Sequence, residues 1–166
     1  MTRDQPVVAI YPGSFDPITK GHEDVARRSL RIVDRVIVAV AHTATHVKGN
    51  LFSPSERMEM IREVFADEDR IEAAEFEGLL VNVVRDLGAQ VIIRGLRAVS
   101  DFEYEFQMAQ MNRELWSEVE TIFLTPDQRY SFLSASLVRE VARLGGDVSN
   151  FVSDSVLKRL EGVFGE

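Results

Sequence analysis

The chain has 166 residues, of which 45% are hydrophobic, so it can bury one core without metals or disulfides, and we expect one domain over residues 1–166. The lack of cysteine excludes disulfides, thiolate catalysis and cysteine-ligated zinc, and no apolar stretch approaches the roughly 20 residues that span a bilayer. The net charge of −8 argues against a nucleic-acid partner, because such partners require a basic surface. At the N-terminus, residues 1–6 lack the apolar run of a secretory signal, so a cytoplasmic location is expected.

The first 65 residues alternate apolar runs with helical patterns. An apolar run at residues 7–11 is closed by Pro12-Gly13, which predicts a buried strand that ends in a turn. Apolar residues recur at helical spacing between residues 21 and 34, and residues 36–41 form a second apolar run typical of a buried parallel strand. A serine cap, a proline and a glutamate predict a helix from residue 53 to about residue 65.

The rest of the chain continues the alternation of strands and helices. Further strands are predicted at residues 71–76, 90–94 and 119–124, and helices at residues 79–87, 101–115, 134–144 and 153–164. Strands separated by helices imply right-handed crossovers, so we expect an α/β fold: a Rossmann-like, doubly wound, five-stranded and mainly parallel sheet with helices on both faces. In such sheets ligands bind beyond the carboxyl ends of the strands.

The turn after the first strand, residues 11–22, is rich in glycine and proline and leads into a helix N-terminus. Backbone N–H groups at such a helix end bind phosphate oxygens, and Gly21 leaves room for a ligand. His22, in the first turn of that helix, is placed to donate a hydrogen bond to a phosphate. The alternative is that the glycines and prolines only shape the turn, while His22 caps the helix or packs locally.

The second cluster follows the fourth strand, where Arg94 and Arg97 flank Gly95. Two guanidinium groups at a strand end form a fork that suits phosphate oxygens. The alternative is a pair of surface arginines that bond to nearby carboxylates at Asp101, Glu103 or Glu105.

The third cluster precedes a helix that begins near Leu137 and contains Tyr130, Ser131, Phe132, Leu133, Ser134, Ala135 and Ser136. Serines at a helix N-terminus usually cap it. The capping and ligand-binding interpretations are compatible, because the same N–H groups and hydroxyls can receive phosphate oxygens.

Several isolated residues allow two interpretations. The spacing alone indicates that Lys48, in the loop of residues 42–52, is an ordinary solvent-exposed lysine. We interpret His42 and His46 as loop residues rather than metal ligands, because no Asp or Glu lies nearby at the spacing of a metal site. Arg129 and Arg143 fit a surface charge and a site residue about equally well. Four apolar side chains after the second cluster are expected to make core or subunit contacts rather than to belong to the site: Phe102, Phe106, Met108 and Met111.

Together these segments resemble the phosphopantetheine adenylyltransferase family of nucleotidyltransferases over essentially the whole chain, with a small insertion near Lys48. Residues 19–22 match the Thr-x-Gly-His form of the family signature, and residues 92–105 match almost letter for letter. Residues 133–136 resemble the family's Ile-Ser-Ser-Ser stretch, but Leu133 and Ala135 depart from it. Ser14 replaces the usual threonine and keeps the hydroxyl.

The resemblance implies transfer of the adenylyl group of ATP to 4′-phosphopantetheine, which gives dephospho-coenzyme A and pyrophosphate in the penultimate step of coenzyme A synthesis. It implies ATP contacts from Ser14, Phe15, His22, Gly95, Leu96, Arg97, Glu105 and residues 130–136. It implies acceptor contacts from Ser14, Lys48, Leu80 and Arg94, and catalytic roles for His22, Lys48 and Arg97. With Phe52 and Arg57 as the reference positions of the alignment, Lys48 matches the family lysine that reaches the reacting phosphates.

The implied chemistry needs no general base, since the attacking group is an ionised phosphate. We expect in-line displacement without a covalent intermediate, and Mg²⁺ bound through the triphosphate and water rather than through protein ligands. The family further implies a homohexamer and feedback inhibition by coenzyme A.

The departure at Ala135 has two possible consequences for ATP binding. If the family contact with ATP at this position is made through the backbone N–H, alanine is harmless. If the contact is made through a side-chain hydroxyl, alanine weakens ATP binding.

Three other functions are weighed against this one. A related adenylyltransferase for another phosphate acceptor would show His-x-Gly-His and lack the Arg-Gly-Leu-Arg segment at residues 94–97. A non-catalytic sensor of nucleotide or coenzyme A would bind ATP without releasing pyrophosphate. A general interaction domain has no reason to place cations and glycines after successive strands.

Overall fold

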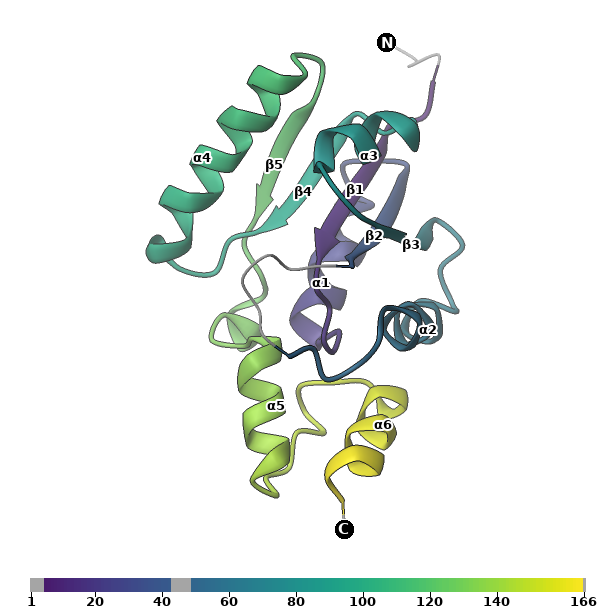
Figure 1. Cartoon of the computed structure of the whole chain (residues 1–166), viewed down its shortest axis with the longest axis vertical. Helices are drawn as coiled ribbons and strands as arrows, with labels where there is room; N and C mark the ends of the chain where they lie inside the picture. The colour runs from purple at the N-terminus through teal and green to yellow at the C-terminus, as the bar shows by residue number, and fades with distance from the viewer. Residues whose placement is uncertain (1–4, 43–48, 166) are drawn as a thin grey trace.

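The computed structural model describes residues 5–42 and 49–165, and within them five parallel strands form one sheet (Figure 1). The strands lie in the order β3-β2-β1-β4-β5. Their bounds are β1 (Val8–Gly13), β2 (Arg35–Ala41), β3 (Ile71–Phe76), β4 (Val91–Gly95) and β5 (Glu120–Leu124). Winding reverses between β1 and β4, which is where a doubly wound sheet opens a crevice for ligands.

The helices agree with the predicted positions to within a few residues, with one exception. They are α1 (Lys20–Ser29), α2 (Pro54–Val64), α3 (Leu80–Asp86), α4 (Val99–Leu115), α5 (Ala135–Arg143) and α6 (Asp154–Phe164), with a short 3-10 helix η1 (Gln128–Tyr130) before α5. The predicted helix over residues 21–34 is wrong at its C-terminal end. Three successive N–H groups after Ser29 bond to carbonyls only three residues back, so the chain tightens out of the α-helix although its apolar spacing continues.

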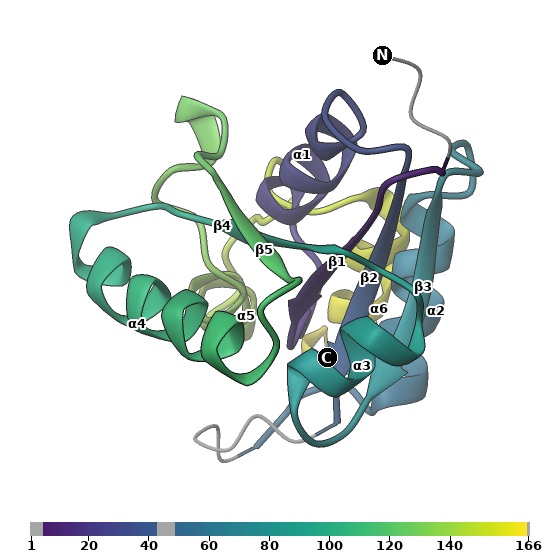
Figure 2. The same cartoon turned by 90° about the horizontal axis from the view of Figure 1, so that it is seen from above.

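Alternate strand residues face two separate cores, as a pleated strand requires. On β1, Ala9 and Tyr11 face the core formed with α1, α2, α5 and α6, while Val8 and Ile10 face the core formed with α3. Figure 2 shows α1 and α3 on opposite sides of the sheet. Helices therefore cover both faces, which confirms the predicted fold class.

The prediction that Pro12-Gly13 forms a turn is wrong, because both residues belong to β1. Pro12 pairs with Ala39 and Gly13 with Val40 in the parallel register with β2. The strand therefore ends at Gly13, and the connection to α1 begins at Ser14. Beyond the carboxyl ends of the strands lie α5 and α6 (Figure 1).

Helix α4 exposes apolar side chains along much of its length. The exposed fractions are 47% for Phe102, 48% for Phe106, 37% for Met108 and 55% for Met111, so these residues do not belong to the core. Figure 1 shows α4 at the outer edge of the sheet beside β5. Among the described residues no helix is both long and apolar enough to cross a membrane.

Candidate active site

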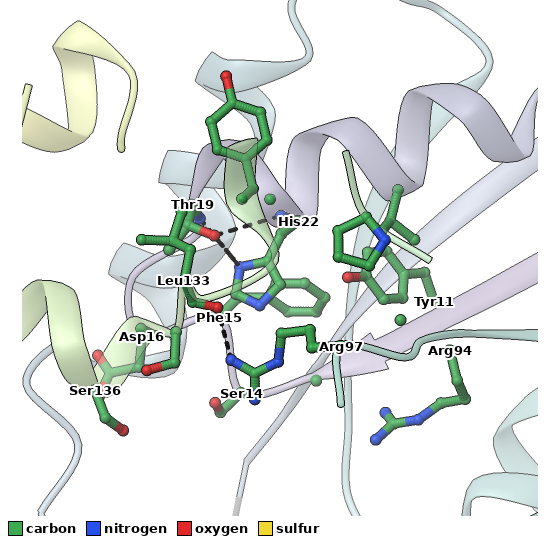
Figure 3. A pocket seen from close by; sticks show the side chains of 18 of the residues that line it. Tyr11, Ser14, Phe15, Asp16, Thr19, His22, Arg94, Arg97, Leu133 and Ser136 are labelled. Carbon is green, nitrogen blue, oxygen red and sulfur yellow. Dashed lines mark hydrogen bonds between the residues drawn. The ribbon is translucent and has the colours of Figure 1, made fainter. Parts of the chain in front are cut away.

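A cavity of about 330 Å³ opens at the carboxyl ends of β1 and β4 (Figure 3). All three predicted clusters reach it: the turn after β1 with the start of α1, the segment after β4, and the segment before α5. His22, Arg97 and Ser134 line this one cavity although they are far apart in sequence. The volume lies at the low end of the range for small-molecule sites.

His22 is held by the N-terminal cap of α1. Its Nδ1 accepts the backbone N–H of Thr19 at 3.1 Å, while the Thr19 hydroxyl accepts the backbone N–H of His22 at 3.3 Å. Because Nδ1 is an acceptor, the neutral ring carries its proton on Nε2. The ring also packs edge-on against Phe15, with ring centroids 5.1 Å apart. The cap thus orients the ring and leaves Nε2–H as a hydrogen-bond donor.

The electrostatic surroundings keep His22 neutral. Burial of the ring, followed by the positive charges of Arg97 and Arg94, lowers the pKa of His22 from 6.5 to about 4. A neutral imidazole donates through Nε2 without bringing a charge of its own. Its role at neutral pH is therefore that of a hydrogen-bond donor.

Arg94 points into the cavity from the end of β4 and is fixed on two sides. Its Nε donates to Glu105 Oε2 at 2.8 Å, and its Nη2 lies 2.5 Å from Glu105 Oε1. Its Nη1 donates to the carbonyl of Pro12 at 2.9 Å. Glu105, on α4, is only 8% exposed, so the pair is held rigidly between β1, β4 and α4.

Arg97 joins the segment after β4 to the segment before α5. Its Nη1 donates to the carbonyl of Leu133 at 2.6 Å, and its Nε lies 3.8 Å from the Asp101 carboxylate. Ser134 caps α5, because its hydroxyl accepts the N–H of Leu137 at 3.1 Å. A guanidinium group and the N-terminal end of a helix therefore face the same space, and both attract anions.

Known proteins resemble the chain over nearly its whole length. Residues 10–141 match the family model described as cytidylyltransferase-like. The phosphopantetheine adenylyltransferase of Aromatoleum aromaticum is 56% identical over 153 residues, which cover 92% of this chain and 93% of that protein. That of Thiobacillus denitrificans is 53% identical and covers 93% of this chain and 95% of that protein. The chain belongs to the phosphopantetheine adenylyltransferase family.

A solved structure shares the fold at much lower sequence identity. The structure titled a putative nicotinate-nucleotide adenylyltransferase from Vibrio parahaemolyticus has a TM-score of 0.71 and 14% identity, and the match covers 94% of this chain and 99% of that one. At this identity the likeness concerns the fold alone. The doubly wound α/β architecture predicted from the sequence is thus also that of a solved protein.

Most residues that the phosphopantetheine adenylyltransferase resemblance selected lie around the cavity. Its lining includes Ser14, Phe15, His22, Arg94, Gly95, Arg97, Glu105, Tyr130, Leu133, Ser134, Ala135 and Ser136. Four selected residues lie outside that lining, namely Leu80, Leu96, Ser131 and Phe132. Lys48 and His46 lie outside the described residues.

For each cluster the local alternative also holds. His22 does cap α1, and Arg94 and Arg97 do face Glu105 and Asp101. Gly21 lines the cavity, and a Cβ there would lie 3.4 Å from Tyr130 Cβ, an ordinary contact distance, so packing against Tyr130 does not by itself require the glycine. In this member of the family the same residues build the fold and line the pocket.

Several residues that line the cavity had no site role predicted from the sequence. These are Tyr11, Asp16, Thr19, Val25, Asn50, Asp101, Pro126 and Arg139. Tyr11 could have been predicted to line the site, since it stands near the carboxyl end of the first predicted strand. Arg139 could also have been predicted, because it lies one helical turn beyond Ala135 and thus on the same face of α5.

The neutral state of His22 leads to a prediction about pH. In the unfolded chain His22 has its ordinary pKa near 6.5, so between pH 6.5 and 4 the unfolded state binds a proton that the folded state does not. The contribution of His22 to stability is therefore complete above pH 6.5 and is lost as pH falls toward 4.

We expect the NMR titration of the His22 ring in the folded protein to have its midpoint near pH 4. The Tm of His22→Gln should also fall less than that of the wild type when pH is lowered from 7 to 4.5. A midpoint near 6.5 would contradict the burial of the ring beside Arg97 and Arg94.

Proposed function

We propose that this chain transfers the adenylyl group of ATP to 4′-phosphopantetheine, giving dephospho-coenzyme A and pyrophosphate. The observation that carries the proposal is the convergence of His22, Arg94, Arg97 and the N-terminus of α5 on one cavity, in a member of the phosphopantetheine adenylyltransferase family. These groups are hydrogen-bond donors and cations, which suits two anionic reactants. The whole chain acts as one adenylyltransferase domain in this proposal.

The reaction proceeds by direct in-line displacement. An oxygen of the acceptor phosphate attacks the α-phosphorus of ATP, a new P–O bond forms, and the bond to the β-phosphate oxygen breaks to release pyrophosphate. His22 donates from Nε2 to the charge that develops on the α-phosphate. Arg94, Ser14 and Lys48 hold the acceptor phosphate, while Arg97 and the capped end of α5 hold the β- and γ-phosphates. Alignment and charge neutralisation are sufficient, since an ionised phosphate needs no base.

Mg²⁺ enters with ATP in this proposal. The proposal assigns no metal to the cavity carboxylates, because Asp16 accepts two backbone N–H groups, Glu105 is bound to Arg94 and Asp101 lies 3.8 Å from Arg97. In the described part of the chain no group of three or more His, Asp and Glu side chains is arranged to hold a metal. When bound through phosphate and water, Mg²⁺ screens the charge of the triphosphate.

The assembly and location of the protein are further parts of the proposal. The exposed apolar face of α4, residues 102–115, contributes to contacts in a homohexamer, because large exposed apolar patches mark contact surfaces. The enzyme acts in the cytoplasm, and coenzyme A, which shares the phosphopantetheine part of the product, inhibits it by binding the same cavity.

The proposal is tested by pyrophosphate release from ATP with a panel of acceptors: 4′-phosphopantetheine, pantetheine without the phosphate, nicotinamide mononucleotide and inorganic phosphate. We expect release with 4′-phosphopantetheine alone. Release with nicotinamide mononucleotide instead would show a related adenylyltransferase with another substrate. ATP binding without release under any condition would identify a non-catalytic sensor and overturn the proposal.

A further inference from the structure

Arg57, on α2, is a charged side chain with no exposed surface. Its Nη1 donates to the carbonyl of Ser14 at 2.7 Å and to the carbonyl of Ala41 at 3.2 Å. Among the described residues its Nε and Nη2 have no hydrogen-bond partner. A buried guanidinium with unmade hydrogen bonds lowers stability relative to an apolar side chain of similar length. The fold alone therefore does not explain an arginine here.

The two carbonyls that Arg57 holds are both next to the site. Ser14 is the first residue after β1 and lines the cavity, and Ala41 is the last residue of β2. The C=O of Ser14 and the N–H of Phe15 belong to one planar peptide and point in opposite directions. By holding that carbonyl on the α2 side, Arg57 fixes the N–H of Phe15 away from α2.

Phe15 transmits this arrangement to His22. Phe15 has a φ of 47°, a conformation that a bulky residue adopts only when its surroundings enforce it. Its ring is 2% exposed and packs against the His22 ring with centroids 5.1 Å apart. A change in the peptide between Ser14 and Phe15 would therefore move the surface that supports His22.

The charge of Arg57 is only partly balanced. Burial lowers the pKa of Arg57, and the Asp16 carboxylate partly offsets this. Asp16, 1% exposed, accepts the N–H groups of Leu51 at 2.8 Å and Phe52 at 2.9 Å, and its Oδ2 lies 3.6 Å from Nη1 of Arg139. The Asp16 carboxylate thus acts on two guanidinium groups, on Arg139 at close range and on Arg57 through space. One carboxylate does not balance two cations, so positive charge remains beside a cavity proposed to take phosphates.

We infer that Arg57 is a positioning residue for adenylyl transfer: it does not line the cavity, but it fixes the Ser14–Phe15 peptide that supports His22 and adds a buried positive charge beneath the phosphates. The inference rests on the proposed function and goes beyond it, since Arg57 contacts no reactant. It acts through Ser14 and Phe15.

The test replaces Arg57 with an apolar side chain of similar length. Arg57→Met removes the charge and both hydrogen bonds while filling the space, so we expect kcat for pyrophosphate release to fall about 10-fold, less than for loss of a direct donor. KM for each substrate should change less than about threefold, and Tm should change little, because the desolvation cost of the charge and the two hydrogen bonds to the Ser14 and Ala41 carbonyls are lost together. Arg57→Lys, which keeps the charge and a donor, should recover part of kcat.

Met60→Ala is the matched control, because Met60 is also fully buried on α2, and its truncation removes packing without removing a charge or a hydrogen bond. It should lower Tm and leave kcat at 25 °C within about twofold of the wild type. A wild-type kcat in Arg57→Met would overturn the inference. If that variant does not fold, Arg57→Gln decides by the same measure, and failure of both neutral variants to fold would show a structural role only. An inactive wild type would instead refute the proposed function.

Discussion

Replacing His22 with alanine is expected to lower kcat by about 10²-fold or more with little loss of ATP binding, on the scale of removing one preorganised donor from a transition state. The physical reason is the geometry of the ring. Nδ1 is occupied by the N–H of Thr19, so Nε2–H is the group that can meet charge on the α-phosphate. Pyrophosphate release at saturating ATP and 4′-phosphopantetheine measures kcat, and calorimetric titration with ATP measures binding.

His42→Ala is the control for the loss of an imidazole. His42 lies just beyond β2, 38% exposed at its side chain, with its Nε2 2.8 Å from Glu75. Exposed pairs of this kind contribute at most about 1 kcal/mol, so we expect unchanged kcat and nearly unchanged stability. Turnover of His22→Ala within twofold of the wild type would remove His22 from the mechanism, whatever the behaviour of the control.

The parts of the site that could be predicted from the sequence are those encoded locally. A strand, a glycine-rich turn and a helix start are read from about fifteen consecutive residues, and they place His22 at the carboxyl end of β1. Ser134 is found in the same way, because a cap lies directly before its helix. The sheet order then brings these local features together at the switch point between β1 and β4.

The interactions that sequence analysis missed depend on three-dimensional packing. Asp16, Arg57 and Arg139 come from three distant segments, and no spacing rule links them. Glu105 was only one of three carboxylates considered as partners of the arginines, because a strand end and a turn lie between Arg94 and Glu105 and their separation follows no helical period. The end of α1 at Ser29 was missed because apolar spacing continues through tight turns that are no longer α-helical.

The pair of Arg94 and Glu105 makes the second large prediction. Arg94→Met leaves the Glu105 carboxylate buried without its partner, and breaking a buried pair in this way costs about 3 to 5 kcal/mol. Because the Arg94 side chain is 31% exposed and the Glu105 side chain 10%, we expect a smaller cost than this, about 2 to 3 kcal/mol in the free energy of unfolding. KM for 4′-phosphopantetheine should also rise by about 10-fold or more, since a phosphate loses a cationic partner.

A double-mutant cycle separates the two effects of Arg94. In Arg94→Met/Glu105→Leu neither charge of this pair remains, so urea unfolding should show most of the stability restored while KM for the acceptor stays high. Arg113→Met is the control, because its pair with Glu120 spans 3.7 Å between side chains that are 61% and 62% exposed, and its loss should change stability by less than about 0.5 kcal/mol. Equal stability of Arg94→Met and the wild type would show that the buried carboxylate does not depend on this partner. A double variant that regained the wild-type KM would mean that Arg94 serves the fold and not the acceptor, since the only change retained from the single variant would be the missing guanidinium group.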